Sequence, residues 1–155
     1  MKASSASNRR APSAGAAATS AAAGTPFTGL RFRVAIEGIR GAGAVEVVLP
    51  AARIVERPRK RRAVQFEVLV IRRGLTRSTD WYQWWDEARQ SKRARRRVQI
   101  ALLDAGGTDA LRWNFAGCVP IGYALSPLNA LAGAAMIESL ELRVGGFELE
   151  RPVAA

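Results

Sequence analysis

The chain has 155 residues and a formal net charge of +11, from 24 lysines and arginines against 13 aspartates and glutamates. It contains no histidine, which excludes a Ser-His-Asp triad, a Cys-His pair and any histidine-ligated zinc site. The single cysteine, Cys118, excludes an intramolecular disulfide, and no apolar run approaches the roughly 18 residues that a membrane span needs.

The first 26 residues differ in composition from the rest of the chain. They are mostly Ala, Ser, Gly, Thr and Pro, with no large hydrophobic residue between Met1 and Phe27. Such a segment cannot bury enough apolar surface to offset its ordering entropy, so we expect a flexible arm. A signal peptide is the alternative, but the segment lacks the Leu, Val or Ile run of an h-region. The sequence therefore predicts an arm over 1–26, one domain over 27–151 and a C-terminal tail over 152–155.

The first half of the domain alternates apolar and polar residues, which is typical of half-buried strands. Residues 31–37 form the first such segment, and a glycine-rich turn leads to a second at 45–49, so a hairpin is predicted. A third strand at 53–57 stops at a proline. A long strand is predicted over 64–73, whose second face becomes apolar halfway along, as in a strand that becomes covered on both sides.

A single helix follows this strand. Asp80 is predicted to cap it, with Gln83 three residues later as a capping-box-like partner. Apolar residues then recur at helical spacing and give the helix one broad face: Trp81, Trp84, Trp85 and Ala88. An aromatic cage for a ligand is the alternative, but packing against a β-rich core is favoured.

The second half of the domain returns to alternating segments separated by glycine- or proline-containing turns. Strands are predicted over 95–103, 111–118, 119–125, 134–144 and 147–150. The turn at 104–108 joins the first two into a hairpin. Trp113 and Phe115 share one strand face, and Glu138 is the polar exception on the apolar face of its strand. Many short strands around one helix predict a mainly β fold, a small β-barrel or sandwich with one flanking amphipathic helix.

The acidic residues do not form a catalytic pair. Asp86 and Glu87 are adjacent and diverge on a helix, while Glu138 and Glu141 point to opposite faces of a strand. A glycosidase-like acid and base are therefore not supported. We expect no enzyme activity, no cofactor and no metal ion.

Half of the basic residues fall in two runs, Arg53, Arg57, Arg59, Lys60, Arg61, Arg62 and then Arg89, Lys92, Arg93, Arg95, Arg96, Arg97. Two interpretations stay open from the charge alone: solvated turns, and a nucleic-acid surface that releases counterions. Neither run lies on a helix shaped for a major groove, so any nucleic-acid contact is expected to be non-specific.

Several sequence elements occur in a recognisable order. Residues 72–85 read RRGLTRSTDWYQWW, and residues 113–142 read WNFAGCVPIGYALSPLNALAGAAMIESLEL. Over roughly residues 27–150 the chain resembles the tail tube proteins of contractile phage tails and of phage-tail-like injection systems. The matching positions are Arg72, Arg73, Gly74 and Thr76 at the strand end, Ser78 to Asp80 at the helix start, Arg96 and Arg97, Trp113 to Phe115, and Pro127 to Asn129 at the turn.

The resemblance implies a structural role in which subunits close into hexameric rings that stack into a hollow tube. Its partners would be copies of itself, sheath and baseplate proteins, and cargo in the lumen. The resemblance also implies a third interpretation of the two basic runs, a lumen or a ring-to-ring contact that faces acidic partners. Assembly would occur in the cytoplasm, with the tube becoming part of a phage-tail-like particle. The strand at 64–73 is our candidate for completing its hydrogen bonds on a neighbouring subunit.

Candidate residues follow from this interpretation. The expected subunit or ring interface comprises Arg59, Lys60, Arg61, Arg62, Arg72, Arg73, Thr76, Asp80 and Asn129. The expected core comprises Trp81, Trp84, Trp85, Trp113 and Phe115.

One segment departs from the family pattern. Members commonly carry a longer glycine-rich loop where residues 57–62 make a short basic turn. A different mode of stacking, or a tube initiator or adaptor, is therefore an alternative to the main tube subunit. Two further alternatives are a basic nucleic-acid-binding accessory protein and a membrane-surface protein that uses the arm.

Overall fold

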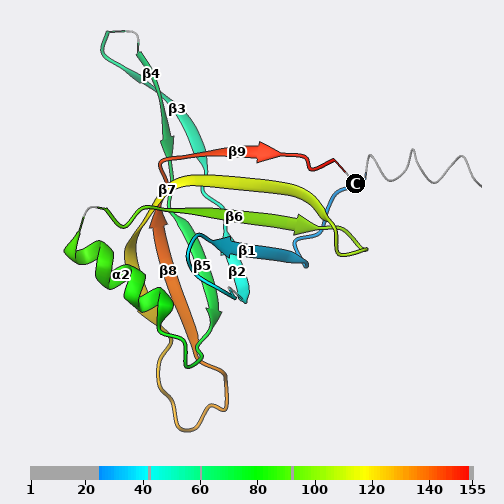
Figure 1. Cartoon of the computed structure of the whole chain (residues 1–155), viewed down its shortest axis with the longest axis vertical. Helices are drawn as coiled ribbons and strands as arrows, with labels where there is room; N and C mark the ends of the chain where they lie inside the picture. The colour runs from blue at the N-terminus through cyan, green and yellow to red at the C-terminus, as the bar shows by residue number, and fades with distance from the viewer. Residues whose placement is uncertain (1–24, 42, 60, 92, 154–155) are drawn as a thin grey trace, which may run out of the picture.

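A computed structural model describes residues 25–41, 43–59, 61–91 and 93–153. Most of the expected arm and Lys60 lie outside these residues, as does the end of the expected tail. The described elements are β1 Phe32–Ile36, β2 Ala44–Val48, β3 Ala52–Arg57, β4 Arg61–Phe66, β5 Leu69–Gly74, α2 Asp80–Gln90, β6 Arg96–Leu103, β7 Asp109–Leu125, β8 Ile137–Arg143 and β9 Gly146–Glu150. The predicted mainly β fold with a single helix is confirmed for the described residues (Figure 1).

The strands form one seven-stranded antiparallel sheet and a separate hairpin. The order in the sheet is β1-β6-β7-β8-β5-β2, and β9 also pairs with β7. The first part of β7 lies between β6 and β9, and its last part pairs with β8. The long, curved β7 therefore connects the two halves of the sheet (Figure 1).

The predicted pairing of the first two strands is wrong. β1 pairs with β6 and β2 pairs with β5, so the two strands lie at opposite ends of the sheet. Only a single bridge, Ile36 to Ile39, forms in the turn that follows β1. The turn signal predicted a change of direction correctly, but each strand pairs with a more distant partner.

The predicted long strand at 64–73 is also wrong, because it is two strands. β4 ends at Phe66 and pairs with β3, while β5 begins at Leu69 and pairs with both β2 and β8. The β3–β4 hairpin projects from the body at one end of the long axis (Figure 1). Conversely, the segments predicted as strands at 111–118 and 119–125 are one strand. The register shifts between Pro120 and Gly122, which accommodates the proline.

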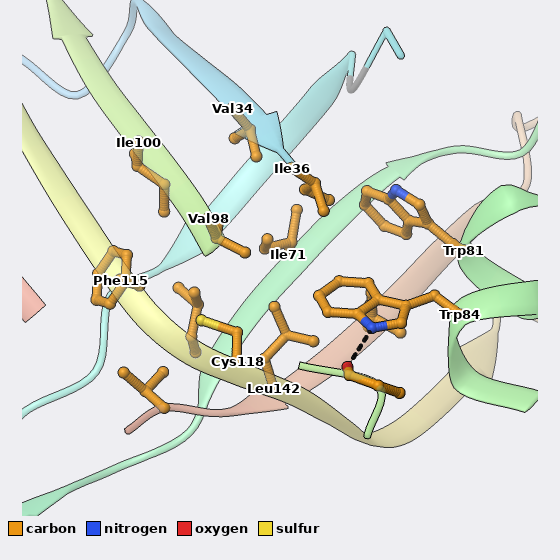
Figure 2. Close-up of a cluster of buried hydrophobic side chains, with 14 residues drawn as sticks. Val34, Ile36, Ile71, Trp81, Trp84, Val98, Ile100, Phe115, Cys118 and Leu142 are labelled. Atoms are coloured by element: carbon orange, nitrogen blue, oxygen red, sulfur yellow. Dashed lines mark hydrogen bonds between the residues drawn. The ribbon is translucent and has the colours of Figure 1, made fainter. Parts of the chain in front are cut away.

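The helix closes one side of the core with two tryptophans. Trp81 and Trp84 are fully buried, and Figure 2 shows their rings pointing toward aliphatic side chains of the sheet. The Trp84 Nε1–H donates a hydrogen bond to the Ala94 carbonyl oxygen at 2.8 Å. Phe115 lies in the same core, whereas Trp85 and Trp113 are half-buried at its rim. No helix among the described residues has the length and hydropathy of a membrane span.

The start of the helix differs by one residue from the prediction. The N-cap is Thr79, not Asp80. The Gln83 Nε2–H donates to Thr79 Oγ1 at 2.9 Å, but this bond joins two side chains four residues apart, and Thr79 makes no side-chain hydrogen bond to a backbone N–H of the helix, so the predicted capping box does not form. Asp80 instead belongs to the first turn, where a carboxylate interacts favourably with the helix dipole.

Candidate assembly surfaces

The tip of the β3–β4 hairpin concentrates positive charge. Arg57 lies directly opposite Arg61 across the two strands, an arrangement that is destabilising in isolation. Arg59 at the turn has a φ of 79°, and Arg62 is also exposed. Within the described residues none of these four arginines forms an ion pair with a carboxylate. This tip therefore holds three of the expected interface residues on one exposed projection.

One face of the same hairpin is apolar. Ile54 and Val64 face each other across the strands and are 69% and 56% exposed. Toward the body, Phe66 packs edge-on against Phe147, with ring centroids 5.6 Å apart. The alternation of Val64 and Phe66 is visible in the sequence. The pairing of Val64 with Ile54 and the exposure of both side chains were not predicted.

Arg72 and Arg73, both expected at an interface, point to opposite sides of β5. Arg72 is partly exposed and pairs with Glu46 at 3.1 Å. Arg73 is 4% exposed and its Nη2 lies 2.5 Å from Asp80 Oδ1 and 3.1 Å from Glu138 Oε1. The expectation that Arg73 reaches a neighbouring subunit is therefore wrong for its side chain, because the sheet and the helix enclose it.

The buried ion cluster joins the helix to the sheet. The Arg73 guanidinium carbon lies 4.1 Å from the centre of the Trp81 ring, and Glu138 is 1% exposed. Partial burial by itself would raise the pKa of Asp80, but hydrogen bonds from Arg73 and Ser78 and the Arg73 charge lower that pKa below its usual value. Glu138, the polar exception predicted on an apolar strand face, therefore has an internal partner.

Two other expected interface residues lie at the end of the molecule away from the hairpin. Thr76 Oγ1 accepts a hydrogen bond from the Ser78 N–H at 3.3 Å, and Asn129 Oδ1 accepts one from the Leu131 N–H at 3.0 Å. Both residues are exposed. The Leu75 N–H donates to the Met136 carbonyl at 2.8 Å, which places their two loops side by side.

The second basic run does not form one surface. Arg89 is ion-paired with Asp86 on the helix. Arg96 donates to the Glu37 carbonyl at 2.7 Å and lies 3.5 Å from Glu87. The fold thus uses part of this charge internally, which weakens the interpretation of both runs as a continuous nucleic-acid surface.

Several strand edges carry no partner within the described part of the chain. β1 pairs only with β6, β2 only with β5, and β9 only with β7. An unpaired edge exposes backbone donors and acceptors that another strand can satisfy. By contrast β5, half of the segment we expected to pair with a neighbour, is interior to the sheet.

A shallow groove crosses the polar face of β1, β6, β7 and β9. Its volume is about 780 Å³, and small residues such as Ala35 and Ala116 line it between longer polar side chains. The Gln99 Nε2–H donates to Asn114 Oδ1 at 2.8 Å, and the Asn114 Nδ2–H donates to Glu150 Oε2 at 3.1 Å. The groove presents paired polar groups and no group of carboxylates, cysteines or histidines suited to a metal ion among the described residues.

Comparisons with known proteins agree with this geometry. The chain is similar in structure to a chain of the PVC extracellular contractile injection system, sheath/tube terminator in the extended state. That match has a TM-score of 0.66 and 14% identity and covers 81% of this chain and 97% of that one. A chain of the PVC sheath-tube complex gives a TM-score of 0.62 at 13% identity, covering 86% and 97%. Hcp1 from Flavobacterium johnsoniae gives 0.59 at 10% identity, covering 78% and 95%.

The family of this chain is identified from its sequence. No curated protein sequence matches the chain. Residues 28–148, however, match the family described as T4-like virus tail tube protein gp19, and this range spans the sheet, the hairpin and the helix. The chain therefore belongs to the T4-like tail tube protein family, whose members are structural tube proteins.

Proposed function

We propose that this chain is a subunit of the inner tube of a contractile phage-tail-like particle, and that copies of it close into hexameric rings that stack. The family match over residues 28–148 carries this proposal. The role is mechanical: a rigid conduit that a surrounding sheath drives through a target envelope. No catalytic residue is assigned.

The unpaired strand edges support self-assembly. β1, β2 and β9 each pair with one strand among the described residues. Edge strands that stay exposed are a hazard to a soluble monomer, and pairing with other copies removes it. Lateral contacts in the ring would therefore use sheet edges rather than the interior strand β5.

The partners follow from the same assignment. One similar structure is described as a sheath-tube complex and another as a sheath/tube terminator. We assign sheath and baseplate proteins as partners of this chain, with assembly in the cytoplasm and cargo in the lumen. Main tube subunit and tube-end adaptor both fit these neighbours.

Negative-stain imaging of the purified full chain tests the proposal, together with sedimentation over a range of concentrations. Annular particles or rods are the expected result. A protein that stays monomeric at every concentration would overturn it. If that monomer also bound duplex DNA with an affinity that collapses between low and physiological salt, the basic accessory-protein alternative would replace it.

A further inference from the structure

The core-facing side of β1, β6, β7 and β9 continues past the core. Leu102 lies directly across from Leu111, and Leu149 lies across from Trp113, two residues further along β7. Side chains two residues apart on a strand share a face, so the three leucines lie on the face that also carries Phe115. Leu102 and Leu111 are half-buried and Leu149 is 57% exposed, and among the described residues none of them belongs to the core cluster. We call Leu102, Leu111 and Leu149 the leucine row.

The leucine row lies at the end of the sheet where the chain enters its first strand. The Arg31 carbonyl accepts a hydrogen bond from the Leu103 N–H at 2.9 Å, and the next residue, Phe32, pairs with Leu102. In Figure 1 the segment that precedes β1 leads into this end of the sheet, on the side away from α2. Residues 1–24 are therefore joined to the fold at the end that carries the row.

The composition of this N-terminal segment suits an apolar surface. No charged residue occurs between Arg10 and Arg31, in a chain of which 24% of the residues are charged. Residues 16–23 are two alanine triplets separated by a threonine and a serine. Alanine side chains can lie on leucines without burying an unpaired charge. The tether also raises the effective concentration of the segment at the row.

The chain between residues 16–23 and the sheet is long enough for this contact. Ala23 and Arg31 are eight positions apart, 31 − 23, which gives a reach of up to about 26 Å at about 3.3 Å per residue. The four strands β1, β6, β7 and β9 span about 14 Å, because neighbouring strands lie about 4.8 Å apart. Residues 16–23 can therefore reach every part of the leucine row.

We propose that residues 16–23 pack on the leucine row of their own chain and cover it in the free subunit. These residues precede the range 28–148 that matches the tail tube family, so the inference does not depend on the tube assignment. Covering the row removes an apolar patch that would otherwise favour non-specific association. Since the contact is intramolecular, its occupancy should not change with protein concentration.

The accessibility of a thiol in the row tests the contact in the full chain. Leu149→Cys places the thiol there, and its rate of reaction with a maleimide is measured. The native Cys118 is fully buried, and its burial raises the pKa of its thiol to about 12, so it does not compete for the reagent. As a matched control, Val45→Cys places a thiol at a 60% exposed position on β2.

Changes in the segment should alter this rate in opposite directions. Ala17→Asp with Ala22→Asp adds two carboxylates that resist burial, so the thiol at position 149 should react about fivefold faster than with the native segment. A fivefold change corresponds to a native contact that is occupied for roughly four-fifths of the time. Ala17→Leu with Ala22→Leu adds apolar surface and should slow the reaction further. The thiol at position 45 should react at one rate in all three backgrounds.

The range of protein concentration separates the chain's own segment from other copies. The protection at position 149 should be the same in dilute samples, where sedimentation shows a monomer, as in concentrated ones. Protection that appears only in concentrated samples would mean that another copy covers the row, and would overturn the inference. Equal rates at position 149 with the native and the aspartate segments would refute it, as would equal acceleration at positions 45 and 149.

Discussion

At the scale of single residues, Arg73 shows what a buried charge requires. Its guanidinium lies between the carboxylates of Asp80 and Glu138 and against the Trp81 ring. Burying an ion pair costs desolvation that only good geometry offsets, and removing one partner leaves an uncompensated charge. Arg73 Nε has no hydrogen-bond partner within the described residues, so the cluster is not fully satisfied.

Arg73→Ala should therefore lower the free energy of unfolding by about 3–5 kcal/mol. The neighbouring Arg72→Ala breaks only a surface pair with Glu46 and should cost less than about 1 kcal/mol. Urea unfolding of the two variants under dissociating conditions measures the difference. Replacing Arg73 and Glu138 together, Arg73→Met with Glu138→Leu, removes the two buried charges and leaves only the partly exposed Asp80, so it should recover most of the loss. Equal effects of the two single alanine variants would contradict the burial argument.

The stability that this cluster contributes should depend on pH through Asp80. Its folded-state pKa lies below the unfolded value, so its contribution to stability is fully present above about pH 4 and is lost as the pH falls through the folded pKa. Asp80→Asn should cost about 1–2 kcal/mol at neutral pH, since a charged hydrogen bond is lost. The gap in melting temperature from the native chain should then narrow in acid. Asp86→Asn, on the exposed side of the helix, is the control for loss of a carboxylate outside the cluster. A difference in melting temperature that widened in acid would contradict the lowered pKa of Asp80.

Trp84 tests the packing of the helix. Its ring is 1% exposed and its Nε1–H is hydrogen-bonded to the Ala94 carbonyl, so Trp84→Ala creates a cavity and orphans an acceptor. We expect a loss of about 3–5 kcal/mol in the free energy of unfolding, measured by denaturant titration. Trp85→Ala, one residue on and half-buried against Tyr123, should cost clearly less. Wild-type melting of Trp84→Ala would mean that the ring is not part of the core.

At the scale of elements, the sequence predicted local structure better than partners. The helix and the 104–108 hairpin are where the periodicity placed them, because both depend on residues close in the chain. Alternation shows which face of a strand is buried but not which strand lies beside it. The pairing of β1 with β6 and of β2 with β5 is non-local, and it could not be predicted from a turn signal.

The candidate interface residues were also predicted well only where local sequence determines their position. Arg72 and Arg73 are adjacent in one motif, yet the alternation of a strand sends one outward and the other into the core. Placing them correctly required knowing that Glu138 lies across from Arg73 on β8. Leu128 and Leu131, which are 85% and 98% exposed on the loop between β7 and β8, were not predicted to be exposed, because an apolar loop has no periodicity. The absence of charged residues around them was visible in the sequence.

The basic hairpin tip should matter for assembly and not for folding. Changing Arg59, Arg61 and Arg62 together to Glu turns the like-charged pair of Arg57 and Arg61 into an opposite-charged one, and the opposite-charged pair of Glu56 and Arg62 into a like-charged one. The two cross-strand effects offset each other, so the free energy of unfolding of the subunit should stay within about 0.5 kcal/mol of that of the native chain. Sedimentation should show altered ring stacking. Changing Arg77, which is exposed between β5 and α2, to Glu is a control for charge reversal outside the hairpin, and unchanged stacking in the triple variant would remove the tip from the interface.

At the scale of the whole molecule, stability should depend on concentration. Free edges on β1, β2 and β9 and exposed leucines at one end are groups that only other copies cover in the proposed tube. Association of the folded state and not of the unfolded one raises the melting temperature by mass action. At a protein concentration a hundredfold above the dissociation constant of the assembly, the free energy of unfolding of the subunit should be higher by about 2.7 kcal/mol.

The dependence of melting temperature on concentration distinguishes association within a ring from stacking of rings. In a variant whose rings form but do not stack, the melting temperature should still rise with concentration, but with a smaller slope than in the native chain. Calorimetry at several concentrations measures both slopes. A melting temperature that is the same at all concentrations would mean that the subunit gains nothing from its neighbours. A melting temperature that fell with concentration would point to aggregation of the unfolded chain, since only binding to the folded state raises it.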